Sequence, residues 1–249
     1  CINYLKENIK IYHAAGQSVE VHTNGSAAAE AYVAALEEAV AAFPNVTDTR
    51  HTSIHGQTME RQHVERLSGH YENLEATADM YADAEFDGAF KDGKVDLSMG
   101  GKLPGNNLDK LMRAQNTVNS YFNNHTYFYG YRHTNQFFGP GRAYNMSPAG
   151  WSEAYGQRYT FHNDTFVTPI SPLRSIQSGV TRFSGDARAA AGQENITVNG
   201  TGHDLNATVN YEARKGDPTT TRKFWTYDHR VNPLQAIHAV TIGPAYQNK

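Results

Sequence analysis

The feature that most constrains the fold of this chain is the alternation of helix-like and strand-like segments near its start. Helical segments repeat their apolar side chains every three or four residues, and strand segments alternate apolar and polar positions. The segments are a helix at 3–14, a strand at 17–23, a helix at 26–43, a strand at 48–56 and a helix at 58–67. Repeated strand–helix units of this kind predict an α/β fold with a parallel sheet.

The helix predicted at 26–43, SAAAEAYVAALEEAVAAF, is the strongest of these signals. Val33, Leu36 and Val40 recur at helical spacing and are expected to face inward. Ser26 precedes the apolar run and is the expected N-cap, because its hydroxyl can accept a hydrogen bond from a free backbone N–H of the first turn.

The later part of the chain continues the pattern between two interruptions. A helix leading into a strand is predicted at 108–122, a strand begins at Tyr159, and a final helix covers 232–247. The segments at 75–118 and 184–222 break the rhythm and are expected to be insertions. The first of them contains Asp92-Gly93, a dipeptide typical of hairpin turns, and a glycine-rich stretch at 99–107 that we expect to act as a lid or contact arm.

Polar residues stand where three of the predicted strands end. His22 and His55 close the first two strands, and Asp164 follows the strand that starts at Tyr159, on the same face as His162. In an α/β barrel, chemistry collects at the carboxyl ends of the strands. Imidazole and carboxylate groups are common ligands of Zn²⁺ and similar divalent ions, and a bound ion acidifies water and polarises carbonyls. We therefore expect a metal site at His22 and His55, with Asp164 as the proton carrier.

Composition excludes several other classes of protein. The formal net charge is −3, so no basic surface points to nucleic acid or anionic lipid. No apolar run approaches the roughly 20 residues of a membrane span. The single cysteine, Cys1, excludes an internal disulfide framework and a cysteine-rich zinc site. Eight Asn-x-Ser/Thr sequons leave the compartment open, either cytoplasmic or exported, although an Asn- and Thr-rich chain also produces such matches by chance.

Several blocks of the sequence together resemble a known family. They are VEVHTNGSAAAEAYVAALEEA, DTRHTSIHGQT, YFNNHTYFYGYRHTNQFFGPGRAYNMSPAG, YTFHNDTFVTPISPLRS and NPLQAIHAVTIGPAYQ. In this order they resemble the YtcJ-like branch of the metal-dependent amidohydrolase superfamily, which includes enzymes acting on N-substituted formamides. The resemblance implies a distorted (β/α)8 TIM barrel of the metal-dependent hydrolase type, of which this chain would supply strands five to eight.

The resemblance also implies roles for individual residues. His22 and His55 match the metal-binding histidines after strands five and six, and Asp164 matches the catalytic aspartate after strand eight. His133 matches a family histidine near the pocket and is the expected substrate-binding residue. The implied cofactor is Zn²⁺ or another divalent metal, and the implied substrate is a small-molecule amide.

The chain also departs from the family pattern. The first-strand His-x-His motif occurs nowhere in the 249 residues, and the family's HTNGD is here HTNGS, with Ser26 in place of the acid. The expected partner is therefore the missing N-terminal half of the barrel, supplied by a longer chain or by a second chain. Without it, the chain alone is expected to bind zinc weakly and to hydrolyse amides poorly.

Two other functions stay open at this point. Half a barrel could be a non-catalytic binding or assembly module. A chain that begins at Cys1 could also be an N-terminal-nucleophile hydrolase that uses its own α-amino group as the base, although such folds have layered antiparallel sheets, which the strand–helix rhythm disfavours.

Overall fold

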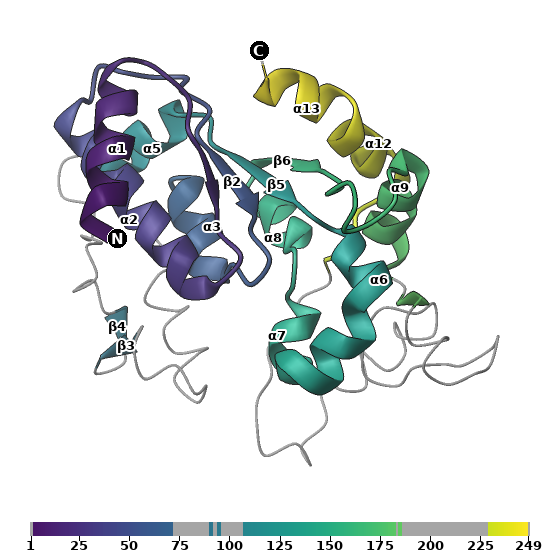
Figure 1. Ribbon diagram of the computed structural model, residues 1–249. Helices are drawn as coiled ribbons and strands as arrows, with labels where there is room; N and C mark the ends of the chain where they lie inside the picture. Colours follow the sequence, from purple (N-terminus) through teal and green to yellow (C-terminus); the bar gives the residue numbers. More distant parts are fainter. Residues whose placement is uncertain are drawn as a thin grey trace. The chain divides into compact units, whose positions relative to one another are not determined.

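The computed structural model describes residues 2–71, 90–91, 94–95, 107–182, 184–185 and 229–248 (Figure 1). The chain divides into two compact units. The first comprises Cys1–Ser120 and Trp151–Arg158, and the second comprises Tyr121–Gly150 and Tyr159–Lys249.

A four-stranded parallel sheet in the order β1-β2-β5-β6 organises the described part of the chain. Its strands are β1 (Glu20–His22), β2 (Thr52–His55), β5 (Val118–Tyr121) and β6 (Arg158–Phe161). In the first unit, β1 and β2 pair with Val21 opposite Ser53, and the N–H of Val118 donates to the carbonyl of His51. In the second unit, the N–H of His162 donates to the carbonyl of Tyr121 at 3.1 Å. The predicted α/β class with a parallel sheet is confirmed.

Helices follow the strands, as expected for strand–helix units. The first unit contains α1 (Ile2–Ala14), α2 (Ser26–Ala42), α3 (Arg61–Leu67), α5 (Leu108–Ala114) and most of α8 (Ala149–Ala154). The second contains α6 (Asn124–Arg132), the π-helix η2 (His133–Phe137), α7 (Gly139–Tyr144), α9 (Pro172–Thr181), α12 (Pro233–Val240) and α13 (Ile242–Gln247).

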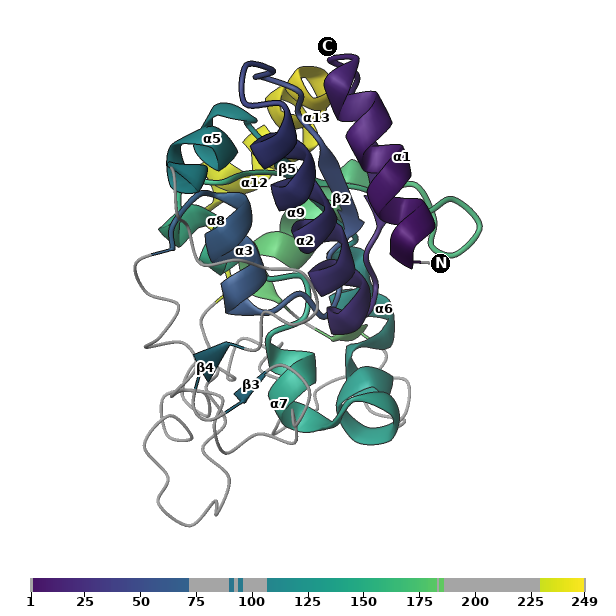
Figure 2. The same cartoon turned by 90° about the vertical axis from the view of Figure 1, so that its left-hand side faces the viewer.

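Helix α2 is the centre of the first unit's core. Val33, Leu36 and Val40 are fully buried, which confirms the predicted inward face. The helix packs against α1, α3 and α5, so it is covered on several sides (Figure 2). Ile9 of α1 and Met112 of α5 belong to the same cluster. Burial of apolar surface around α2 therefore stabilises this unit.

The second unit has a separate core built on β5 and β6. Tyr121, Tyr159 and Phe161 are buried there against Ala236 and Ala239 of α12. The single final helix predicted at 232–247 is divided at Thr241 into α12 and α13, and Pro233 lies in the first turn of α12. The side chain of Asn232 caps it by accepting a hydrogen bond from the N–H of Gln235.

One helix start differs from its prediction. Ser26 is the first residue of α2, and the N-cap is Gly25, whose extended backbone has φ −92° and ψ 152°. Ser26 therefore does not cap α2, because its own backbone already belongs to the helix.

The interruptions are described only in part. Strands β3 (Phe90–Lys91) and β4 (Lys94–Val95) pair antiparallel on either side of positions 92–93, as a hairpin turn at Asp92-Gly93 predicts. The glycine-rich stretch at 99–107, apart from its last residue, and nearly all of 184–222 lie outside the described residues. The lid prediction stays a prediction.

Candidate functional site

Two histidines meet at the carboxyl ends of β1 and β2 in the first unit. The ring centroids of His22 and His55 lie 5.0 Å apart, with the rings tilted by 51°. The strand ends are held together locally, because the N–H of Thr23 donates to the carbonyl of Ile54 and the hydroxyls of Thr23 and Ser53 lie 2.6 Å apart. The structure therefore brings the two predicted metal ligands side by side.

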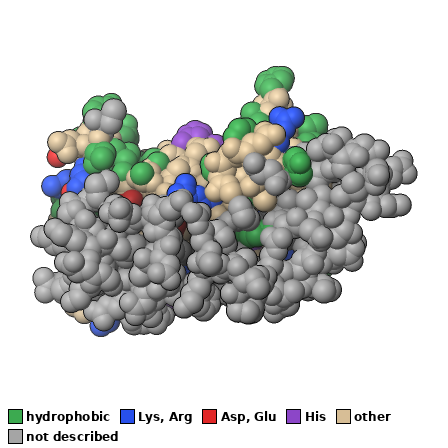
Figure 3. Space-filling view, turned by 90° about the horizontal axis from the view of Figure 1, so that it is seen from below, with side chains coloured by type: hydrophobic (Ala, Val, Ile, Leu, Met, Phe, Trp, Pro, Cys, Tyr) green, Lys and Arg blue, Asp and Glu red, His purple; other side chains and the backbone are tan. Residues whose placement is uncertain are grey.

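The backbone of His55 has a conformation that is uncommon for a residue with a side chain. Its φ is +71°, and Gly56 follows with φ +49°. Left-handed backbone costs free energy in non-glycine residues, and such conformations cluster at functional sites. His55 is buried whereas His22 is exposed, so the pair has one ring shielded from solvent and one ring open to it. Figure 3 shows histidine side chains, in purple, reaching the surface of the described part.

In the second unit, His162 and Asp164 follow β6. The Nε2 atom of His162 lies 3.7 Å from a carboxylate oxygen of Asp164, and both side chains are partly exposed. The carbonyl of Asp164 accepts hydrogen bonds from the N–H groups of Val167 and Thr168, at 3.0 and 2.9 Å. The aspartate thus sits at the start of a tight turn, with its carboxylate accessible beside an imidazole.

His133 is placed by α6 and η2, and a series of ring contacts connects it to His162. The ring of His162 stacks on that of Phe122 with 5.5 Å between the ring centroids, and the centroids of Phe122 and His125 lie 3.9 Å apart. His125 in turn lies 5.6 Å from His133, which stacks on Phe138 at 5.0 Å. His133 is buried in this aromatic wall, so it belongs to the same part of the second unit as His162.

Candidate metal donors are therefore present in both units. In the first unit, His55 can offer a ring nitrogen to an ion, beside the exposed His22. In the second unit, His162 can offer a ring nitrogen and Asp164 a carboxylate oxygen. Imidazole and carboxylate are the ligand types that zinc accepts, so the residues fit such an ion chemically. His162 is the donor that the prediction omitted. Its position two residues before Asp164 on one strand face was the signal that could have identified it.

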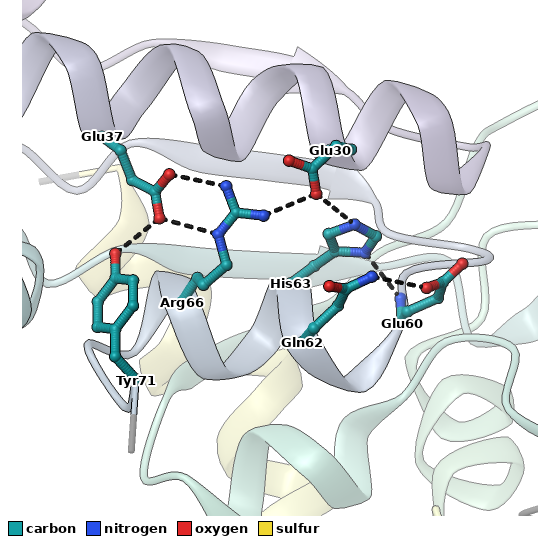
Figure 4. A network of polar contacts seen from close by, with 7 residues as sticks. All are labelled: Glu30, Glu37, Glu60, Gln62, His63, Arg66 and Tyr71. Carbon is teal, nitrogen blue, oxygen red and sulfur yellow. Dashed lines mark hydrogen bonds and ion pairs between the residues drawn. The ribbon is translucent and has the colours of Figure 1, made fainter. Parts of the chain in front are cut away.

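A second polar cluster lies inside the first unit, between α2 and α3 (Figure 4). The guanidinium of Arg66 donates two hydrogen bonds to Glu37, at 2.9 and 2.7 Å, and one to Glu30, at 2.7 Å. The hydroxyl of Tyr71 donates to Glu37 at 2.7 Å. His63 accepts from the N–H of Glu60 through Nδ1, so its proton lies on Nε2, which donates to Glu30.

The charges in this cluster are balanced locally. Burial alone would raise the pKa of Glu30, but the hydrogen bond from His63 and the charge of Arg66 outweigh it and lower that pKa to about 2. Burial would likewise lower the pKa of Arg66, but the carboxylates of Glu37 and Glu30 raise it overall. Arg66 is almost fully buried and hydrogen-bonded to both carboxylates, so the cluster connects α2 and α3.

A buried histidine pair lies at the amino end of β2. His51 Nδ1 accepts from the N–H of Val19 at 3.1 Å, so its Nε2–H donates to Nδ1 of His13, also at 3.1 Å. Both side chains are fully buried. Burial, together with the neighbouring His13, lowers the pKa of His51 to about 3. His51 is therefore a packing residue that joins α1 and the segment before β1 to β2.

Comparison of the chain with protein-family models, curated proteins and solved structures finds no match. Among the described residues, no helix has the length and apolar character that crossing a bilayer requires.

Proposed function

We propose that this chain carries part of the active site of a metal-dependent amidohydrolase, with the second half of a (β/α)8 TIM barrel as its scaffold. The observation that carries the proposal is the His22–His55 pair, 5.0 Å apart at the ends of two neighbouring parallel strands. Packing alone does not require an exposed imidazole beside a buried one whose backbone is left-handed.

In this proposal His22 and His55 hold a divalent ion, for which Zn²⁺ is the best candidate. His162 is an additional ligand or orients Asp164, whose carboxylate lies 3.7 Å away. His162 and Asp164 follow the carboxyl end of β6, as His22 and His55 end β1 and β2, and the carboxyl ends of parallel strands are where α/β enzymes place their chemistry. The aromatic wall that contains His133 binds the substrate.

A bound ion supplies Lewis-acid chemistry, because it lowers the pKa of water and polarises a carbonyl oxygen. The Asp164 carboxylate accepts the proton that water loses as its oxygen bonds to the amide carbon. Asp164 then donates this proton to the nitrogen as the C–N bond breaks. The products are a carboxylic acid and an amine, so no further reactant is needed. The substrate class is an amide or a formamide-type compound.

Further ligands complete the ion's shell in this proposal. The family that the sequence resembles uses a first-strand His-x-His, which this chain lacks, so the first half of the barrel is the proposed partner. Metal affinity depends on the number of ligands and on how well they are held in place, so the chain alone binds zinc more weakly than the completed barrel.

The test combines zinc titration calorimetry with a hydrolysis screen of formamides and acyl amides. Wild-type chain is compared with His22→Ala, His55→Ala and Asp164→Asn, and with a longer form that contains the first barrel half. His238→Ala is the matched control, because His238 is an exposed histidine on α12. The two ligand variants are expected to lose at least about tenfold in zinc affinity, since even residues that only support a ligand contribute that much. Asp164→Asn is expected to retain zinc and lose turnover.

The outcomes separate the candidate functions. Turnover by the longer form that survives Asp164→Asn would contradict the mechanism. Zinc binding by the longer form without hydrolysis of any amide would favour the non-catalytic binding module. Equal zinc affinity of His22→Ala, His238→Ala and the wild type would remove the basis of the metal site.

A further inference from the structure

The turn after Asp164 exposes several large apolar side chains. Phe166 is fully solvent-exposed, and Val167 and Ile170 are 51% and 69% exposed. Figure 2 shows the segment after β6 as a loop that projects from its unit, at the right of the view. Single exposed apolar residues are ordinary, but three of the five residues from 166 to 170 form a local concentration that the core of this unit does not use.

The backbone holds Phe166 in a strained conformation. Its φ is +80°, a genuine outlier for a bulky aromatic residue. The turn is fixed on both sides of it, because Val167 and Thr168 donate to the carbonyl of Asp164 and the hydroxyl of Tyr129 donates to the carbonyl of Val167 at 2.9 Å. A strained residue persists where its surroundings hold it in place, and such positions cluster at ligand clamps and active sites. Here the strain presents an aromatic ring to solvent.

The same turn carries the proposed proton carrier. Two peptide units separate Phe166 from Asp164, so their Cα atoms lie within about 7 Å of one another. We propose that Phe166, flanked by Val167 and Ile170, is a specificity-determining residue that contacts an apolar group of the substrate while Asp164 acts at the amide. The inference rests on the proposed function and narrows its substrates to amides that carry an aromatic or bulky apolar substituent.

The test is direct binding, so that it does not depend on turnover. Phenylacetamide and acetamide differ by one phenyl group and share the amide. Saturation-transfer NMR titrations of both compounds are compared on the full wild-type chain and on Phe166→Gly, Phe166→Tyr and Leu234→Ser. Leu234 is the control, because it is a 76% exposed apolar residue of another element, α12.

Wild-type chain is expected to bind phenylacetamide about three- to tenfold more tightly than acetamide, the range that one aromatic contact supports. Phe166→Gly should remove this preference, Phe166→Tyr should keep it and Leu234→Ser should leave it unchanged. Glycine also tolerates a φ of +80°, so Phe166→Gly is expected to keep the melting temperature, and misfolding is not an alternative explanation.

The preference and the proposed hydrolase function can fail separately. In one outcome, the preference for phenylacetamide disappears in Phe166→Gly, and the longer form neither binds zinc nor hydrolyses amides. This result would support the Phe166 contact and contradict the hydrolase function. In another outcome, the longer form hydrolyses amides, but the wild type binds phenylacetamide and acetamide equally, or Phe166→Gly keeps the preference for phenylacetamide. Either result would overturn the Phe166 contact and leave the hydrolase function standing. Failure of the wild type to bind phenylacetamide at all would also overturn it.

Discussion

Strand β2 has a histidine next to each of its ends, and the two have opposite surroundings. His51, which precedes the strand, is fully buried and hydrogen-bonded to His13 and to the backbone of Val19. His55, which ends the strand, has a left-handed backbone and lies beside the exposed His22. Residues of one type, four positions apart, therefore differ in what they can do. The amino-end pair uses its nitrogens to join elements, whereas the carboxyl-end pair includes a ring that a ligand can reach.

The comparison predicts that buried polar groups of the first unit determine stability and that strand-end groups determine ligand binding. Each class should respond to substitution in one measurement and leave the other nearly unchanged. The variants below test this separation, from the largest expected change in the free energy of unfolding to the smallest.

Arg66→Met should have the largest effect on stability. The substitution leaves the carboxylates of Glu37 and Glu30 buried without their cation, and breaking a buried ion pair in this way costs about 3–5 kcal/mol. Urea denaturation followed by circular dichroism measures the loss. Lys10→Met is the matched control, because Lys10 is exposed on α1 and should change stability by less than about 0.5 kcal/mol. A loss below about 1 kcal/mol for Arg66→Met would show that the cluster is not structural.

His51→Ala should destabilise the chain by about 2–4 kcal/mol. It removes a fully buried ring and leaves both the N–H of Val19 and Nδ1 of His13 without their partner. Zinc affinity should stay at the wild-type value. The same urea experiment and the zinc titration check both statements. If His51→Ala instead lost tenfold in zinc affinity at unchanged stability, His51 would be a ligand-binding residue and not a structural one.

Acid should weaken the amino-end pair. The pKa of His51 is about 3 in the folded chain against 6.5 unfolded, so the unfolded chain binds the proton more readily between these values. Stability is therefore complete above about pH 6.5 and falls as the pH drops towards 3. Protonation of His51 in the unfolded chain therefore lowers the free energy of unfolding by about 2 kcal/mol between pH 7 and pH 5. Burial also lowers the pKa of His13, although the carbonyl of Phe43 partly opposes this.

Urea midpoints at pH 7, 6 and 5 measure this loss. In His51→Phe the pH dependence over this range should be smaller than in the wild type, because the buried titrating group is gone. An unchanged slope in that variant would assign the acid sensitivity to other groups, such as His229, whose pKa burial also lowers.

The sequence predicted one side of this comparison better than the other. The period of apolar residues placed Val33, Leu36 and Val40 inward and ended two strands at His22 and His55, because these features depend on local geometry that repeats along the chain. Parallel pairing then brings strand ends to one edge of the sheet, so the His22–His55 contact followed from topology.

The contacts that escaped prediction depend on packing between distant segments. Arg66 and Glu37 meet because α2 and α3 lie against one another, and nothing in either segment alone indicates the partner. The His13–His51 pair similarly requires the packing of α1. Ser26 was misplaced for a local reason, because either of two adjacent residues could have begun α2 and the extended Gly25 became the cap.

His22→Ala should have the smallest effect on stability and a clear effect on ligand binding. His22 is exposed at the end of β1, so its removal creates no cavity, and a change within about 0.5 kcal/mol is expected in urea. Zinc affinity should nevertheless fall at least about tenfold, because one of two neighbouring imidazoles is lost. The contrast with His51→Ala is the sharpest test of the comparison, since both variants remove one ring from a histidine pair. If His22→Ala lost stability as His51→Ala does while zinc affinity stayed constant, the carboxyl-end pair would be a packing contact, and the proposed metal site would lose its first two ligands.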